Sequence, residues 1–410
     1  MATTWWPNRS EPLPMDEHKS DPATALIHHP YQPPGGFVAP QVPVHKASTV
    51  IFPTVAALRA RDWKSKAGYT YGLHGTPTSY VLEERIATLE GGLQSQLVPS
   101  GLAAIALVDL ALLKSGDELL IPENAYGPNR ELARQELARF GIAHRVYDPM
   151  DLASFEAALG PATRLVWLEA PGSVTMEFPD LRALAARARA HGALVALDST
   201  WGAGIAFDAF AVGADIAVHA LTKYPSGGGD VLMGAVTTRD EALHLRLKGA
   251  HMRMGWGVGA NDVETVLRSL ATLPLRYAAQ DEAGRALARW WQAQACIAQV
   301  LHPALPGSPG HEHWKALCTR AAGLFSVVFD ERVPHERAIA FVDALRLFKL
   351  GYSWAGPVSL AVPYDLSLMR PRPAWKGLLV RFSIGLEAVD DLIADCAQAL
   401  RAAGLDSGLA

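Results

Sequence analysis

The chain has 410 residues, of which 50% are hydrophobic and 19% are charged, and its formal net charge is -4. These values are ordinary for a globular protein, and the small negative charge gives no electrostatic reason to expect nucleic acid or an anionic membrane as a partner. The most apolar stretch, residues 102–113, is short and contains Asp109, so the sequence predicts no transmembrane segment.

The first part of the chain, residues 1–75, contains many prolines and few periodic segments, with a turn expected at 33–36. We expect an extended arm that contacts a neighbouring subunit. The N-terminus has no basic region followed by an apolar stretch, which predicts no signal peptide. The three cysteines are far apart and show no metal-ligand spacing, which favours a reducing compartment. We therefore expect a cytoplasmic protein.

Residues 76–265 alternate short apolar runs with helical stretches rich in Ala, Leu and Arg. Several of the runs are apolar at consecutive positions, as in strands that are covered on both faces. The alternation predicts a large domain with a mostly parallel sheet, whose ligands lie beyond the carboxyl ends of the strands. The expected strands are 96–98, 118–121, 165–168, 193–197, 216–218 and 233–236, and the expected helices are 102–113, 130–140 and 180–191.

Residues 266–410 predict a smaller α+β domain. Helical patterns cover about 260–300, strands are expected at 324–329 and 378–384, and an amphipathic helix begins near Ala388. The boundary near residue 265 is drawn from this change of pattern.

Two charged residues are expected on the same rim of the large sheet. Asp198 ends the apolar run 193–197, and Lys223 follows the run 216–218 and precedes a glycine-rich loop. Asp198 is either a turn or cap residue, or a carboxylate that pairs with the pyridine nitrogen of pyridoxal phosphate (PLP). Lys223 is either a solvated surface residue, or a desolvated amine suited to Schiff-base chemistry.

Three further positions support a cofactor site. Gly101 and Leu102 begin a helix directly after a strand, and such N–H groups bind phosphate. Tyr126, which follows another strand, either packs in a loop or stacks on an aromatic cofactor. Arg381 lies within the strand 378–384, where it faces either solvent or a substrate carboxylate.

With these residues in place, the chain resembles the PLP-dependent enzymes of cysteine and methionine metabolism, the transsulfuration group of fold type I, and most of all the bacterial cystathionine β-lyases. The resemblance covers about residues 45–400. It implies an aspartate-aminotransferase-like α/β fold with a seven-stranded, mostly parallel sheet. The motifs that carry it are Leu168-Glu169-Ala170-Pro171-Gly172-Ser173-Val174-Thr175-Met176-Glu177, Asp198-Ser199-Thr200-Trp201, Thr222-Lys223-Tyr224, Leu301-His302-Pro303-Ala304-Leu305-Pro306 and Tyr352-Ser353-Trp354.

The resemblance also implies roles for individual residues. Lys223 would hold PLP covalently and move the α-proton, Asp198 would pair with the ring nitrogen, and Tyr126 would stack on the ring. Tyr71 would be donated by the adjacent subunit, in a homo-oligomer expected to be a dimer of dimers. The phosphate would be held by Gly101, Leu102, Thr200 and Thr222, and the substrate would be bound by Arg381, Ser353 and Trp354.

Two positions depart from the family pattern. The family commonly has an arginine that binds the cofactor phosphate two residues after the donated tyrosine, whereas this chain has Leu73 followed by His74. Leucine cannot replace a bidentate arginine contact, so His74 or another donor would have to take its place. Ala220 stands where many relatives carry a serine that approaches the phosphate.

The resemblance implies a carbon–sulfur β-lyase that converts L-cystathionine to homocysteine, pyruvate and ammonia in methionine biosynthesis. The nearest alternatives are γ-elimination or γ-replacement enzymes and a cysteine desulfhydrase on the same fold. A more remote alternative is a PLP-fold protein that serves as a non-catalytic scaffold. Leu73 favours that alternative, and the presence of the other site residues speaks against it.

Overall fold

The computed structural model describes residues 35–36, 38–370 and 373–406. The chain forms two units, Met1–Val42 and Pro43–Ala410. Most of the first unit, and with it residues 1–34 of the expected arm and half of the expected turn at 33–36, lies outside the described residues. The helices and strands of the described residues all belong to the second unit.

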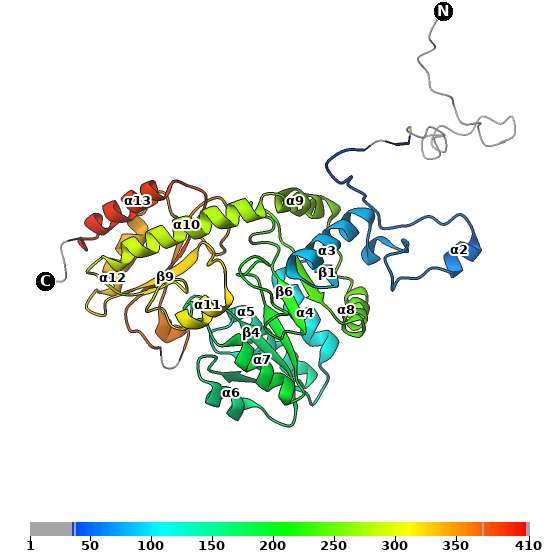
Figure 1. Ribbon diagram of the computed structural model, residues 1–410, viewed down its shortest axis with the longest axis horizontal. Helices are drawn as coiled ribbons and strands as arrows, with labels where there is room; N and C mark the ends of the chain where they lie inside the picture. Colours follow the sequence, from blue (N-terminus) through cyan, green and yellow to red (C-terminus); the bar gives the residue numbers. More distant parts are fainter. Residues whose placement is uncertain (1–34, 37, 371–372, 407–410) are drawn as a thin grey trace, which may run out of the picture. The chain divides into compact units, whose positions relative to one another are not determined.

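A seven-stranded sheet forms the first half of this unit, and Figure 1 labels its strands β1, β4 and β6. The order of the strands is β1-β7-β6-β5-β4-β2-β3. Strands β6, β5, β4, β2 and β3 are parallel, and β7 runs antiparallel to both β6 and β1. The mostly parallel, seven-stranded prediction is therefore confirmed. The strands are β1 Gln94–Val98, β2 Glu118–Pro122, β3 Ala143–Tyr147, β4 Thr163–Glu169, β5 Leu194–Asp198, β6 Ile216–His219 and β7 Gly234–Thr238.

Helices cover both faces of this sheet, which explains why its central strands are apolar at consecutive positions. Side chains of α6 and α7 pack in one hydrophobic cluster, and those of α4, α5 and α8 pack in another. The helices of this half are α3 Pro77–Glu90, α4 Gly101–Leu112, α5 Gly127–Gln135, η2 Leu137–Phe140, α6 Leu152–Ala158, α7 Leu181–Ala190 and α8 Glu241–Met254.

A second, five-stranded sheet follows in the order β10-β11-β12-β9-β8, packed against α10, α12 and α13 around its own core (Figure 1). Its strands are β8 Ile297–Leu301, β9 Leu324–Phe329, β10 Lys349–Leu350, β11 Leu360–Tyr364 and β12 Leu379–Ser383. The helices are α9 Ala260–Leu270, α10 Leu273–Gln292, α11 His311–Leu317, α12 His335–Ala344, η3 Leu366–Leu368 and α13 Val389–Ala402. The predicted division at residues 75 and 265 stays a prediction.

Two expectations need correction. The helical stretch expected to reach residue 300 ends earlier, because α10 stops at Gln292 and residues 297–301 form β8. The solvent-facing alternative for Arg381 is wrong, because both faces of β12 are covered and all five of its residues are buried. Leu379 packs in the cluster that extends into the large sheet, while Val380 and Phe382 pack in the core of the five-stranded sheet.

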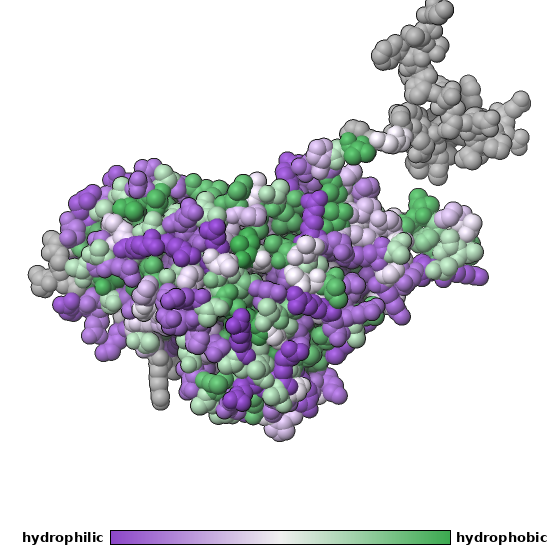
Figure 2. Space-filling model, in the orientation of Figure 1, coloured by the Kyte–Doolittle hydropathy of each residue, from purple (hydrophilic) through white to green (hydrophobic). Residues whose placement is uncertain are grey.

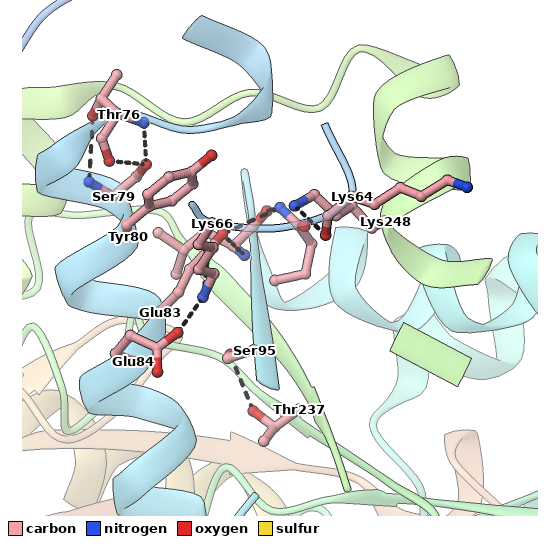
Figure 3. Close-up of polar contacts among 12 residues, drawn as sticks. Lys64, Lys66, Thr76, Ser79, Tyr80, Glu83, Glu84, Ser95, Thr237 and Lys248 are labelled. Carbon is pink, nitrogen blue, oxygen red and sulfur yellow. Dashed lines mark hydrogen bonds and ion pairs between the residues drawn. The ribbon is translucent and has the colours of Figure 1, made fainter. Parts of the chain in front are cut away.

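The segment that leads into α3 is extended apart from two short helices, α2 Val55–Arg59 and η1 Gly72–His74. No residue of α2 is buried, and Ile51 and Val55 are 91% and 61% exposed. Figure 2 shows hydrophobic residues among hydrophilic ones along this segment. The segment is joined to α3 by Lys66, whose ammonium lies 3.0 Å from Glu83 and 2.6 Å from Glu84 (Figure 3). We call these three residues the arm cluster.

Among the described residues, no helix is long and apolar enough to cross a membrane.

Candidate active site

A cavity of about 640 Å³ lies at the carboxyl ends of the large sheet and reaches the small sheet. A cavity of this size suits a cofactor together with a small substrate. All but one of the site residues expected from the sequence line it, the exception being Tyr71. The cavity-lining members of that set are Gly101, Leu102, Tyr126, Asp198, Thr200, Thr222, Lys223, Ser353, Trp354 and Arg381.

Lys223 lies in the loop that follows β6. Its Nζ donates to the Ser353 hydroxyl at 2.6 Å and lies 5.4 Å from the centre of the Trp354 ring. Burial and the nearby charge of Arg381 lower the pKa of the Lys223 ammonium to about 8, although Asp198 opposes the shift. A primary amine with this pKa is neutral far more often at physiological pH than an ordinary lysine, and the neutral form is the nucleophile and base.

Two carboxyl groups lie next to each other below the cavity. Asp198 ends β5 and Glu169 ends β4, and the two residues are paired in the parallel register of these strands. Burial raises the pKa of Asp198, while hydrogen bonds from Thr200 oppose the shift. Burial, followed by the charge of Asp198, raises the pKa of Glu169 well above its usual range. Both carboxyl groups therefore hold a proton more readily than exposed ones, and the effect is the larger for Glu169.

The start of α4 provides hydrogen-bond donors for a phosphate. The first N–H groups of a helix have no intrahelical acceptor, and Ser100 caps only the N–H of Ala103, at 3.0 Å. A side chain on Gly101 would bring its Cβ to 2.6 Å from the Ala220 side chain, so glycine permits the close approach of α4 to the lysine loop.

The two threonine hydroxyls both have partners within the chain. Thr200 Oγ1 accepts from the Ala220 N–H at 3.0 Å, and a hydrogen bond from the Thr200 side chain lowers the pKa of Asp198. Thr222 donates its proton to the Met233 carbonyl at 3.2 Å. Because a phosphate dianion only accepts hydrogen bonds, either hydroxyl would have to turn its proton toward the phosphate in order to bind it.

Tyr126 lies at the N-terminus of α5, where it is the residue that precedes the first helical residue. Its backbone N–H donates to Glu169 Oε2 at 2.7 Å. Burial, and then the charges of Asp198 and Glu169, raise the pKa of its hydroxyl. Glu169 thus holds the backbone of a tyrosine whose ring lines the cavity.

Arg381 reaches the cavity from the small sheet. Its Nη2 donates to the Ser353 carbonyl at 3.3 Å, and its Nε is buried without a hydrogen-bond partner among the described residues. The loop that carries Ser353 is strained, because Ser353 and Ala355 have φ values of 94° and 66°. The guanidinium therefore retains donors for a carboxylate next to Lys223.

The motif Leu168–Glu177 forms one wall of the cavity and is fixed from behind. Glu177 Oε1 accepts from Arg370 Nη1 at 2.8 Å, and Glu177 Oε2 accepts from the Asn124 amide at 3.2 Å. This network joins the loop after β4 to the loop after β2 and to the small sheet. The Leu168–Glu177 motif therefore has a structural role, because its contacts hold one wall of the cavity in position.

Tyr71 does not line this cavity and is 46% exposed. Leu73 and His74 line a separate cavity of about 450 Å³ beside α9. His74 Nδ1 is 2.6 Å from Thr70 Oγ1, and burial, Lys248 and Arg61 lower the pKa of His74. Within its own chain, His74 therefore does not take the place of the missing arginine.

Among the charged residues that line the cavity, sequence reasoning missed two, Glu169 and Arg130. Glu169 was present in the quoted motif, and its position at the end of an apolar run matches that of Asp198. Arg130 follows Tyr126 by four residues, a spacing that places two residues on the same side of a helix. Both signals were present in the sequence.

The residues present fit PLP. The cavity combines an amine of lowered pKa, the carboxyl group of Asp198, an aromatic side chain and an open helix N-terminus. It also has an arginine with an unpartnered buried nitrogen at the opposite side.

Comparison with known proteins agrees with this chemistry. The family profile described as "Cys/Met metabolism PLP-dependent enzyme" matches residues 23–401. A putative cystathionine beta-lyase of Rhizobium johnstonii is 41% identical over 372 residues, which cover 90% of this chain and 92% of that protein. The L-methionine gamma-lyase of Pseudomonas putida is 33% identical, with 93% of this chain and 97% of that protein covered.

A solved structure extends the similarity to the fold. The cystathionine gamma synthase of Xanthomonas oryzae pv. oryzae superposes with a TM-score of 0.81 and 30% identity, and the match covers 89% of this chain and 93% of that chain. This confirms the expected fold type I architecture. The chain therefore belongs to the Cys/Met metabolism PLP-dependent enzyme family.

Proposed function

We propose that this protein is a PLP-dependent carbon–sulfur β-lyase that cleaves L-cystathionine to homocysteine, pyruvate and ammonia in methionine biosynthesis. The observation that carries the proposal is the position of Lys223. An amine with a pKa of about 8 lies beside the only arginine of β12, in the same cavity as Asp198.

Six residues would hold the cofactor. Lys223 would bind it covalently, and Asp198 would accept a hydrogen bond from the pyridine nitrogen and keep it protonated. Tyr126 would stack on the ring. The N–H groups of Gly101 and Leu102 would bind the phosphate, with the Thr200 hydroxyl as a further donor. When bound, PLP supplies an electron sink for the charge left at Cα after the α-proton departs.

The remaining steps are assigned to side chains of the cavity. Arg381 binds the substrate α-carboxylate and orients the Cα–H bond toward Lys223. The neutral Lys223 amine takes the α-proton, which it can do because its pKa lies near the working pH. The Cβ–S bond then breaks, the sulfur leaves with homocysteine, and hydrolysis of the three-carbon fragment gives pyruvate and ammonia. Ser353, which accepts from Lys223, would keep the amine in place between these steps.

The β-lyase assignment rests on the motifs Leu168–Glu177 and Tyr352–Trp354 and on the curated β-lyases that are similar to this chain. The alternatives are γ-elimination or γ-replacement, which similarity to a methionine gamma-lyase keeps open, and a cysteine desulfhydrase. All of them use the same lysine, so the product separates them.

The test is turnover of L-cystathionine by the purified, PLP-loaded protein, with identification of the keto acid. Pyruvate together with homocysteine is the expected result. Formation of 2-oxobutyrate and cysteine would contradict the β-lyase assignment and support γ-elimination. A protein that does not bind PLP stoichiometrically would favour the scaffold alternative.

We further propose that the active enzyme is a homo-oligomer, a dimer of dimers, in which Tyr71 completes the cavity of a neighbouring subunit. Its support is that Tyr71 is exposed and absent from the cavity of its own chain, on a segment that buries little of its apolar surface. Mixing Lys223→Ala protein with Tyr71→Phe protein tests this, because a mixed dimer would contain one intact site. Activity that never exceeds the sum of the two variants would contradict it.

A further inference from the structure

Arg130 lies in the first turn of α5 and lines the same cavity as Lys223. Its Nε is buried and has no hydrogen-bond partner among the described residues. In that part of the chain only one other arginine, Arg381, has a buried side-chain nitrogen of this kind. The two arginines line one cavity, and Arg381 is the residue assigned above to a carboxylate.

The carboxyl groups around Arg130 are engaged elsewhere. Glu131 forms an ion pair with Arg134 at 2.7 Å, and Glu123 lies 3.6 Å from Arg370. Glu169 already accepts from the Tyr126 N–H and forms no ion pair with Arg130 in the described part of the chain, and burial, followed by Asp198, raises its pKa well above the usual range. Arg130 thus lacks a charged partner among the described side chains, although its charge is felt by Glu123, Glu131 and Glu169.

The charges in the cavity leave Arg130 available for an anion from outside the chain. The lining contains three basic side chains, Lys223, Arg130 and Arg381, and two carboxyl groups, Asp198 and Glu169, whose pKa values are both raised by burial. An unpaired guanidinium with a buried nitrogen is costly unless an anion binds it. Its planar fork matches a carboxylate or a phosphate in a bidentate contact.

We propose that Arg130 binds a second carboxylate of the substrate, so that the cavity selects a sulfur amino acid that carries a carboxylate at each end. This inference rests on the proposed function, in which Arg381 binds the α-carboxylate and the start of α4 binds the cofactor phosphate. Arg130 is then a specificity-determining residue. A second source of the same anionic chemistry is the cofactor phosphate itself, and the experiment separates the two.

The experiment compares two β-elimination substrates in the PLP-loaded enzyme. L-cystathionine has a distal carboxylate and a distal ammonium group, and S-propyl-L-cysteine has the same thioether without either. Arg130→Gln is expected to raise the KM for L-cystathionine about 10- to 100-fold with little change in kcat, as for the loss of a charge-assisted contact. The KM for S-propyl-L-cysteine should change less than about twofold. Arg130→Lys keeps the positive charge but loses the planar guanidinium. Its KM for L-cystathionine should lie between those of Arg130→Gln and the unmodified enzyme.

A matched control lies on the same helix. Arg134→Gln, which removes an exposed ion pair with Glu131, should leave both KM values and PLP binding unchanged. Equal KM changes for the two substrates in Arg130→Gln, or no change for either, would overturn the inference. A tenfold loss of PLP affinity in Arg130→Gln with equal effects on both substrates would assign Arg130 to the cofactor phosphate and would also overturn it.

The outcome can be separated from that of the proposed function. The dissociation constants of L-cystathionine and S-propyl-L-cysteine can be measured by titrating each into the PLP-loaded enzyme and following the absorbance of the cofactor. This measurement does not depend on which carbon–sulfur bond the enzyme breaks. If the unmodified enzyme forms 2-oxobutyrate, the β-lyase assignment fails. The ratio of the two dissociation constants, in the unmodified enzyme and in Arg130→Gln, still decides the role of Arg130.

Discussion

Lys66 and Lys223 are both largely buried and have opposite chemistry. In the arm cluster, burial disfavours the charged form of Lys66, but Glu83 and Glu84 outweigh this effect and its pKa is raised (Figure 3). In the active-site cavity, burial and Arg381 outweigh Asp198, and the pKa of Lys223 falls to about 8. Lys66 contacts two carboxylates at 3.0 and 2.6 Å, whereas Lys223 contacts a serine hydroxyl.

The comparison shows that the contact partner, rather than burial, decides what a buried lysine does. A lysine next to a carboxylate keeps its proton and joins two segments of chain. A lysine next to a hydroxyl and an arginine gives up its proton more readily and becomes a base or nucleophile.

The largest expected effect is the loss of turnover when Lys223 is removed. Lys223→Ala should reduce turnover by about 10³-fold or more, because it removes the base and the covalent attachment of the cofactor. Purified Lys223→Ala protein should also lack the absorbance of lysine-bound PLP. A variant that retains this absorbance, or turns over substrate at an unchanged rate, would contradict the assignment of Lys223.

Lys66→Ala is the matched control. It leaves Glu83 buried without its cation and should lower the free energy of unfolding by about 3 kcal/mol, as for breaking a buried ion pair. Thermal unfolding measures this loss. The cofactor absorbance of the folded protein should be unchanged, since the arm cluster does not line the active-site cavity.

The next effect is a pH dependence that distinguishes the two lysines. The neutral amine of Lys223 is the form that reacts with the aldehyde of PLP. With a pKa of about 8 in place of 10.5, the neutral fraction at pH 7 is about 300-fold larger than for an ordinary lysine. The rate at which the apoenzyme attaches PLP should therefore rise with pH through about 8 and become constant above it.

Stopped-flow absorbance at a series of pH values measures the rate of PLP attachment and gives the pH at which that rate is half its maximum, the midpoint. Arg381→Gln should move it upward, because the positive charge of Arg381 is one of the causes that lower the pKa of Lys223. Lys66→Ala should leave it in place. A midpoint near 10.5 in the unmodified protein would show that Lys223 behaves as a surface lysine.

The sequence was sufficient for the central strands of the large sheet and for the residues at their ends. Strands β4 and β5 are buried on both faces, so their apolar residues are consecutive and their ends are marked by the first polar residue. This placed Asp198 and Lys223 on one rim. Strand β3 was missed because it lies at the edge of the sheet, where only one of its five residues is buried.

The pairing of side chains could not be predicted from the sequence. Glu169 lies beside Asp198 only because β4 and β5 are neighbours in register. The unpartnered state of Arg130 depends on the ion pairs formed by Glu131 and Glu123 with residues of α5 and of the small sheet. The sequence could not decide whether Arg381 faces solvent or a substrate, because both faces of β12 are covered by segments that are distant in the sequence.

The smallest expected effect concerns the two neighbouring carboxyl groups. Glu169→Gln should change kcat/KM by less than about threefold, because the new amide would be neutral like the protonated acid and its carbonyl can accept from the Tyr126 N–H. Asp198→Asn, the same change one strand away, removes the charge that holds the ring nitrogen protonated and should reduce kcat/KM at least about tenfold. The loss of kcat/KM in Glu169→Ala should lie between those of the other two variants, because this change leaves the Tyr126 N–H without its acceptor. Steady-state kinetics with L-cystathionine at neutral pH ranks the three variants. If Glu169→Gln were as damaging as Asp198→Asn, Glu169 would act as a carboxylate in the working enzyme, and the expectation that it is neutral there would be wrong.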